Sequence, residues 1–170
     1  FANQHFYGGQ LDIVPVAHQQ APLEWRHYNT DDADEQLVAT HRLSFIDTPY
    51  PPTEDSNKIN RNEARITARL VKAIHQLCQK NDLPFDAARR IGIIVPFRNQ
   101  IAMIAHELAA LDIEGTEAIT IDTVERYQGS QRDIIIYSTT VSQPYQLDIL
   151  SVTTQADGQL IDRKLNVALT

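Results

Sequence analysis

The chain has 170 residues, of which 42% are hydrophobic and 22% charged, and a formal net charge of −7 at pH 7. This composition is typical of a soluble globular domain with enough apolar material for a core. The acidic balance argues against a protein that binds nucleic acid through a basic surface spread over the whole domain. A phosphate-binding groove confined to one part of the surface stays compatible with it.

A single cysteine, Cys78, excludes an internal disulfide and cannot form a zinc site alone. It lies on the apolar stripe of a predicted helix, so a buried, unreactive thiol is expected. The six histidines have no metal-ligand spacing, and no metal site is predicted. No apolar run approaches the ~18–20 residues that cross a bilayer, and no secretory segment opens the chain, so a cytoplasmic or nuclear setting is expected. The chain starts at Phe1 and stops at Thr170 inside a periodic segment, as a piece of a longer protein would.

The N-terminal quarter has no regular pattern, and we expect residues 1–42 to be an irregular lead-in to an α/β core over residues 43–170 of the same single domain. Within it, the acidic run DDADEQ (31–36) is expected to be a solvated loop. The apolar run LSFID (43–47) predicts a first short strand. The three prolines of TPYPPTEDSNK (48–58) then predict a loop.

Two amphipathic helices follow. Asn60 lies three residues before Glu63, which is the spacing of a capping box, so a helix is expected to start there with Glu63 chiefly as a cap. Apolar residues then recur at helical spacing at Ile66, Leu70, Val71, Ile74, Leu77 and Cys78. The same spacing at Ile101, Ile104, Ala105, Leu108 and Leu111 predicts a second helix.

Three further strands alternate with these helices. They are predicted at IGIIVPF (91–97), EAITIDTV (117–124) and DIIIYSTT (133–140). Near-continuous apolar strands separated by helices indicate parallel β-α-β units, hence a three-layer α/β domain with a mostly parallel sheet covered on both faces. Farther on, Asp157-Gly158 predicts a hairpin turn, and the last residues resemble the start of a helix.

Polar clusters follow three of the predicted strands, at PFRNQ (96–100), DTVERYQG (122–129) and TTVSQ (139–143). In open parallel sheets, the loops at the carboxyl ends of the strands hold the ligand. The chain has no GxxxxGK(S/T) phosphate loop and no acidic strand end for magnesium, so it cannot be a self-sufficient P-loop ATPase. Its cationic, hydroxyl and amide side chains would suit a partner domain that closes over a nucleotide bound elsewhere.

Three segments in this order carry a family resemblance: VPFRNQ (95–100), TVERYQGSQRDIIIYS (123–138) and DRKLNVALT (162–170). They resemble motifs IV, V and VI of superfamily-1 helicases, in the branch that includes the nonsense-mediated-decay RNA helicase and senataxin. The resemblance implies a C-terminal, RecA-like motor domain with a P-loop NTPase-like fold that lacks the P-loop itself. Such a domain forms one wall of an ATP cleft and part of a track for single-stranded DNA or RNA. ATP with magnesium would be held mainly by an N-terminal RecA-like domain of the same chain.

The resemblance also implies roles for individual residues. Contacts to the nucleotide are expected from Gln128, Gly129, Gln131, Arg163 and Asn166. Contacts to nucleic acid are expected from Pro96, Phe97, Arg98, Gln100 and Thr123. Gln131 stands where relatives often have glutamate, and a neutral amide can still donate and accept there. The arginine finger is expected just past Thr170, so no catalytic residue is assigned within the chain, and the chain alone is expected to be inactive.

Other interpretations remain open from the sequence. Arg98 could cap or pair at the start of its helix, Gln100 could be a solvated amide on a helix face, and Trp25 is expected in the core or an interface. For the whole chain, one alternative is a non-motor α/β module that binds a small nucleotide or a protein. Another is a degenerate helicase-like scaffold, which Gln131 keeps open. A GxxxxGK(S/T) motif upstream in the natural chain would favour the motor.

Overall fold

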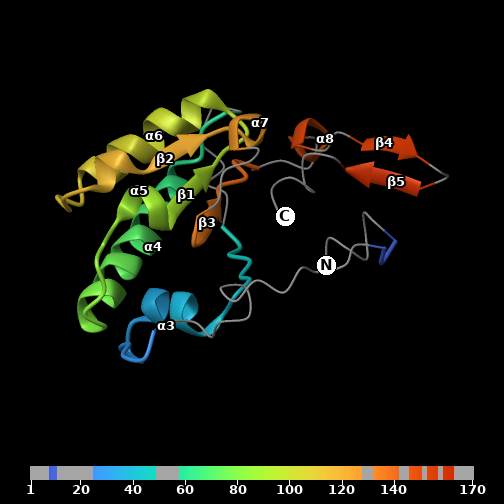
Figure 1. Cartoon of the computed structure of the whole chain (residues 1–170). Helices are drawn as coiled ribbons and strands as arrows, with labels where there is room; N and C mark the ends of the chain where they lie inside the picture. The colour runs from blue at the N-terminus through green and yellow to red at the C-terminus, as the bar shows by residue number, and fades with distance from the viewer. Residues whose placement is uncertain are drawn as a thin grey trace.

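The computed structural model describes residues 8–10, 25–48, 58–127, 132–141, 146–150, 153–156 and 159–162. Strands β1 (Ile91–Ile94), β2 (Thr120–Asp122) and β3 (Ile134–Tyr137) form a parallel sheet in the order β2-β1-β3 (Figure 1). The remaining elements are α3 (Ala33–Thr40), α4 (Arg61–Lys80), α5 (Ala87–Arg90), α6 (Arg98–Ala109), η1 (Thr116–Ala118), α7 (Val124–Tyr127), α8 (Leu147–Leu150), β4 (Thr153–Ala156) and β5 (Gln159–Asp162). The predicted α/β class with a parallel sheet is confirmed.

Helix α4 begins where the sequence predicts. The Asn60 side chain accepts a hydrogen bond from the N–H of Glu63 at 3.1 Å, and its Nδ2 donates to Glu63 Oε1 at 3.1 Å. This reciprocal pair satisfies one of the free N–H groups at the helix start. On the apolar face, Ile74, Leu77 and Cys78 are fully buried, as predicted. Each large aliphatic side chain buried in this way contributes about 1.5–3 kcal/mol, so packing against the sheet and α6 fixes α4.

The two faces of the sheet are covered differently. Because side chains alternate along a strand, Ile91 and Ile93 of β1 pack into the main core with α4 and α6. Gly92 and Ile94 lie on the other face, which is covered within the described part of the chain by α7. All four residues of β1 are buried, as a central parallel strand requires, but Ile135 of β3 is 40% exposed.

Two expectations for the N-terminal part are wrong. The acidic run expected to be a loop begins helix α3, because Asp32 caps it by accepting from the N–H groups of Asp34 and Glu35, each at 3.0 Å. The run 43–47 forms no strand with any described residue, and Phe45 is 89% exposed. A short apolar run does not reveal whether a neighbouring strand is available to pair with it.

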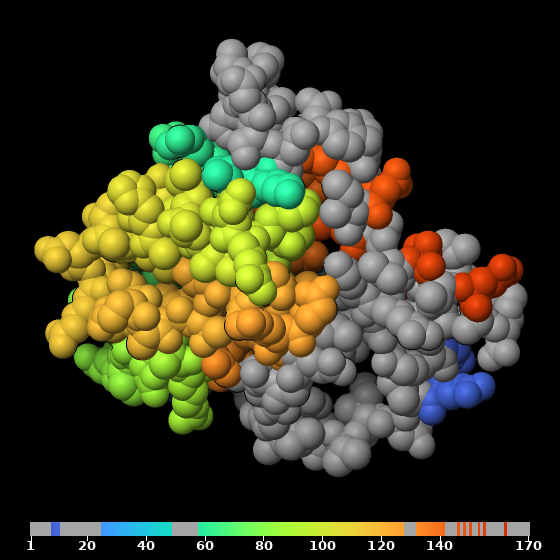
Figure 2. Space-filling view, turned by 90° about the horizontal axis from the view of Figure 1, so that it is seen from above, coloured from blue at the N-terminus to red at the C-terminus, as the bar shows by residue number. Residues whose placement is uncertain are grey.

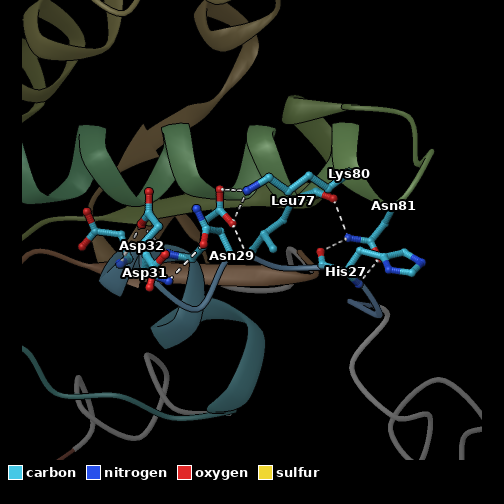
Figure 3. A network of polar contacts seen from close by, with 9 residues as sticks. His27, Asn29, Asp31, Asp32, Leu77, Lys80 and Asn81 are labelled. Atoms are coloured by element: carbon cyan, nitrogen blue, oxygen red, sulfur yellow. Dashed lines mark hydrogen bonds and ion pairs between the residues drawn. The ribbon is translucent and has the colours of Figure 1, made fainter.

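A polar network joins α3 and the preceding segment to the C-terminal end of α4 (Figure 3). Lys80 Nζ lies 2.6 Å from Glu35 Oε1, and Glu35 also accepts from the N–H of Asn29 at 2.9 Å. The Asn81 side chain accepts from the N–H of His27 at 2.9 Å and donates to its carbonyl at 2.7 Å. We call these five residues the scaffold network. It fixes the end of α4 that lies away from the carboxyl ends of the strands.

Strands β4 and β5 pair antiparallel with Ala156 opposite Gln159, which confirms the hairpin predicted around residues 157–158. The turn residues themselves, and the helix start predicted after residue 162, lie outside the described residues. In the described ranges, no helix has both the length and the apolar character needed to cross a membrane.

Candidate nucleic-acid interface

The carboxyl ends of the three parallel strands meet at one edge of the sheet. In the register, Ile94 lies opposite both Asp122 and Tyr137. Beyond the strands, the N–H of Val95 donates to the carbonyl of Asp122 at 3.0 Å, and the N–H of Ser138 donates to the carbonyl of Ile94 at 2.9 Å. The polar clusters that follow the strands therefore share this edge, as predicted, for the residues of each cluster that the structure describes.

The order of the strands places β1 at a switch point. The chain runs from β1 to β2 on one side of it and then to β3 on the other side. In open α/β sheets, ligands bind in the crevice outside the carboxyl ends of the strands at such a point. The loop after β1 is therefore the centre of the candidate interface.

That loop presents Pro96, Phe97 and Arg98. The first two are half-buried, and Arg98 is exposed at the first position of α6. Phe97 occupies the N-cap and provides no side-chain hydrogen bond to the free N–H groups of the helix. Within the described part of the chain, neither an ion pair nor a hydrogen bond involves the Arg98 side chain, so the alternative that it caps or pairs finds no support. A cation at the positive end of a helix dipole destabilises the helix, so the charge of Arg98 does not stabilise α6.

Gln100 requires a correction. It was expected either to contact nucleic acid or to be a solvated amide, but its side chain has no exposed surface. Its Oε1 accepts from the N–H of Asn60 at 2.9 Å, and its Nε2 donates to the Asn60 carbonyl at 2.9 Å and to Ser138 Oγ at 3.2 Å. Both ends of the amide are thus engaged inside the protein. Gln100 joins the start of α6 to the start of α4 and to the loop after β3.

Glu63 is the second link between these segments. It is only 7% exposed, and its Oε2 accepts from Ser138 Oγ at 2.7 Å and from the N–H of Thr140 at 2.8 Å. Its Oε1 accepts from Asn60 and, at 3.4 Å, from Thr139 Oγ1. The sequence revealed the cap but not these contacts, because Ser138 is 75 residues away along the chain. We call Asn60, Glu63, Gln100, Ser138 and Thr140 the strand-end network.

The strand-end network lies beneath the surface at the predicted edge. In Figure 2 the start of α4, in teal, adjoins the start of α6, in yellow-green, and the segment from β2 to α7, in orange, adjoins the start of α6 on its other side. All five network residues are buried. The neighbouring residues Phe97, Arg98 and Thr123 retain exposed surface. The network therefore positions the edge, and the neighbouring side chains are available for contact.

The loop after β2 is held by the start of α7. The carbonyl of Thr123 accepts from the N–H groups of Arg126 at 3.0 Å and Tyr127 at 3.2 Å. Thr123 is half-buried. Asp122 and the exposed Arg126 form an ion pair at 3.6 Å. This pair contributes little to stability because water screens the two charges. The backbone turn, rather than this ion pair, fixes Thr123 at the edge.

Tyr127 anchors α7 on the sheet. Its hydroxyl donates to the carbonyl of Thr120, and burial raises the pKa of its phenol. A Cβ atom on Gly92 would lie 2.9 Å from the Tyr127 ring and 2.9 Å from Ile135 Cδ1, closer than real contacts allow. Gly92 is therefore the residue that lets the ring lie across β1. The sequence contained a signal for this contact, because a glycine within an apolar strand marks a position where another group approaches closely. It did not indicate that Tyr127 would be that group.

The five residues expected to contact nucleotide, Gln128, Gly129, Gln131, Arg163 and Asn166, all lie outside the described residues. Their roles stay predictions. In the described ranges, no three potential metal-ligating side chains cluster together.

The parallel sheet and its helices place the chain in the RecA-like α/β class. The family model described as an AAA domain matches residues 1–170, and the chain belongs to this family of superfamily-1 helicase domains. The branch with the nonsense-mediated-decay helicase and senataxin, expected from the motifs, is confirmed, because the relatives include a regulator of nonsense transcripts 1 and Helicase SEN1 of Saccharomyces cerevisiae.

Three relatives illustrate the similarity. The chain is 31% identical to the DNA replication ATP-dependent helicase/nuclease DNA2 of Xenopus laevis over 79% of its length and 12% of the relative. It is 31% identical to a probable helicase of Dictyostelium discoideum over its whole length and 15% of that protein. It is 34% identical to the regulator of nonsense transcripts 1 of the same organism over 66% of its length and 8% of the relative. The chain thus spans less than a sixth of the length of these relatives.

Proposed function

We propose that this chain is the C-terminal motor domain of an ATP-dependent helicase, with the carboxyl edge of its sheet as part of the track for single-stranded DNA or RNA. Support comes from the family, whose relatives above carry helicase names, and from the three strand-end loops at one edge. We further propose a cytoplasmic or nuclear setting for the parent protein.

The observation that carries this proposal is the placement of Arg98. It is exposed at the start of α6, beside N–H groups that no side chain caps, where its charge opposes the helix dipole. A bound phosphate would remove that conflict, because it would accept from the free N–H groups and neutralise the guanidinium. The charge of −7 on the whole chain would then confine attraction for the nucleic-acid backbone to this edge.

In this account, the described residues bind and orient the nucleic acid. Arg98 attracts a phosphate, the Thr123 hydroxyl donates to the backbone, and Phe97 offers an apolar surface to a base or sugar. ATP bound between this domain and an N-terminal RecA-like partner would supply the energy for movement along the strand. We assign no magnesium ligand and no chemical step to the described residues.

The proposal is tested on the parent protein. We expect its ATPase to be stimulated by single-stranded oligonucleotide, and Arg163→Ala and Gln128→Ala each to depress that stimulation. Oligodeoxythymidine and oligouridine measured in parallel distinguish DNA from RNA. The isolated 170-residue chain is expected to hydrolyse no ATP, because in related phosphoryl-transfer enzymes a supplied arginine is worth about 10³–10⁵ in turnover.

Two results would contradict the proposal. A parent protein whose ATPase ignores single-stranded oligonucleotide would favour a non-motor module or a scaffold. Unchanged stimulation in both variants would refute the assignment of Arg163 and Gln128 but leave the motor function standing.

A further inference from the structure

Glu63 has more hydrogen-bonding partners than a helix cap needs. In a capping box the carboxylate accepts from the backbone N–H of the N-cap residue. Here Glu63 Oε1 accepts from the Asn60 side chain at Nδ2 instead, and the Asn60 backbone N–H donates to Gln100 Oε1. The carboxylate is buried and receives three further donors from the loop after β3: the Ser138 hydroxyl, the Thr139 hydroxyl and the N–H of Thr140. Within the described part of the chain these donors are neutral, so the carboxylate binds a loop rather than a cation.

The loop that it binds has an unfavourable backbone. Thr140 has φ +58°, in the left-handed region, and it is 1% exposed. That conformation is rare for a β-branched residue, and such residues persist only where their surroundings hold them. Among the described residues, two hydrogen bonds hold it: the Thr140 N–H donates to Glu63 Oε2 at 2.8 Å, and the Thr140 hydroxyl donates to the Ser138 carbonyl at 3.4 Å.

The same residues connect the loop after β3 to the loop after β1. Ser138 Oγ donates to Glu63 and accepts from Gln100, in the first turn of the helix that Arg98 begins. A change at Glu63 would therefore reach the position of Arg98 through Ser138 and Gln100. The contacts are short and buried, so they transmit position without exposing Glu63 to ligand.

We propose that Glu63 is a positioning residue for nucleic-acid binding: it holds the strained loop after β3 and, through Ser138 and Gln100, the loop that presents Arg98. This rests on the proposed function, since the edge must bind nucleic acid for its position to affect binding. Glu63 does not touch the nucleic acid itself.

The test uses the parent protein with Glu63→Gln. One of the two carboxylate oxygens becomes an NH₂ group, so either Asn60 Nδ2 or the Ser138 and Thr140 donors face another donor. We expect the half-saturating oligodeoxythymidine or oligouridine concentration for ATPase stimulation to rise on the order of tenfold, as for a lost bond to a charged group. ATPase without oligonucleotide should be unchanged. Hydrogen exchange at the Thr140 amide should quicken.

Glu107→Gln is the matched control, because Glu107 is a partly exposed glutamate on α6 whose ion pair with Arg65 spans 3.9 Å.

A rescue variant separates positioning from capping. When Asn60→Asp is combined with Glu63→Gln, the carboxylate introduced by the first substitution can accept both from the helix N–H and from the amide NH₂ introduced by the second. The oxygen of that amide is then free to accept from Ser138 and Thr140. We expect this double variant to recover both nucleic-acid binding and the slow hydrogen exchange of the wild-type Thr140 amide.

If Glu63→Gln does not fold, Ser138→Ala gives the same readouts with the cap intact. It is also expected to raise the half-saturating concentration.

The outcomes are distinguishable. A half-saturating concentration no higher than in Glu107→Gln, with Thr140 exchange unchanged, overturns the proposal. A lower melting temperature without a change in these two readouts also overturns it. If the wild-type parent shows no stimulation, the proposed function fails instead, and unchanged Thr140 exchange in Glu63→Gln would then overturn the positioning role by itself.

Discussion

The two ends of helix α4 are held by polar networks of different kinds. At its C-terminal end the scaffold network contains a buried carboxylate, Glu35, neutralised by Lys80 at 2.6 Å (Figure 3). At its N-terminal end the strand-end network contains a buried carboxylate, Glu63, which receives neutral donors from Asn60, Ser138 and Thr140. Both carboxylates are satisfied, but only the first is paired with a cation in the described part of the chain.

This difference separates fold from function. An ion pair between two helices fixes their packing and carries no further consequence. A carboxylate that receives backbone and hydroxyl donors from a strained loop fixes that loop, and here the loop lies at the edge of the sheet that we propose binds nucleic acid. The end of α4 near the strand ends therefore supports the proposed interface, and the other end supports the domain.

The largest expected effect comes from breaking the scaffold network. Lys80→Met leaves the Glu35 carboxylate, 1% exposed, without its cation. We expect the free energy of unfolding to fall by about 3 kcal/mol, measured by urea unfolding of the chain. Arg69→Met is the control, because the Arg69–Asp34 pair spans 2.8 Å but Arg69 is 60% exposed, and an exposed pair is worth about 1 kcal/mol or less. Equal losses in the two variants would refute the contrast between a pair whose carboxylate is buried and a more exposed pair.

A smaller loss is expected at the strand end. Gly92→Ala brings a Cβ to 2.9 Å from the Tyr127 ring and from Ile135 Cδ1, so the free energy of unfolding should fall by about 2 kcal/mol. Adding Ile135→Val removes one of the two clashing groups and should restore part of this loss. Wild-type stability in Gly92→Ala, measured by urea unfolding, would mean that Tyr127 does not lie across β1 as described.

Arg98→Ala sharpens the comparison because its two effects have opposite signs. Removal of a cation from the start of α6 should raise stability by about 0.5 kcal/mol. The affinity of the parent protein for single-stranded oligonucleotide should fall, and its logarithmic salt dependence should flatten by about one phosphate contact. Arg89→Ala is the control, because Arg89 is exposed just before β1, at the opposite end of that strand. An equal loss of affinity in both variants would indicate a diffuse electrostatic effect.

The smallest effect concerns alkaline pH. Burial raises the pKa values of Tyr127 and Tyr137, so the folded state holds these phenolic protons more tightly than the unfolded state. Stability is unaffected below about pH 10, the ordinary tyrosine value, and falls as the unfolded state ionises above it. Tyr137→Phe should make the decline of melting temperature with pH shallower. A slope as steep as that of wild type would show that Tyr137 ionises equally in both states, and Tyr28→Phe, at an exposed tyrosine, is the control.

The sequence was sufficient for what local patterns determine. The start of α4 at Asn60 and its buried face, the three parallel strands, and the shared edge of their loops follow from spacing and strand order. The start of α3 was missed although a signal was present, since Asp32 precedes Glu35 by three residues as a cap would. The acidity of the run concealed it.

The contacts at the candidate site were not predictable in this way. Gln100 has the sequence context of an exposed first-turn residue, yet its amide pairs with Asn60, 40 residues away. Glu63 has a local role that fully accounts for its spacing, so nothing in the sequence pointed to Ser138. Both depend on the packing of α4 against α6 and on the loop after β3, which exist only in the folded chain.

Hydrogen exchange of the parent protein with and without a single-stranded oligonucleotide tests most directly whether the two ends of α4 differ in function. We expect slower exchange on binding in residues 95–99 and 138–141, at the carboxyl ends of β1 and β3. Residues 26–29 and 80–82, around the scaffold network, should exchange at the same rate in both states. Slower exchange on binding only around the scaffold network, or an equal change on binding at both ends of α4, would contradict the assignment of the strand ends as the nucleic-acid interface.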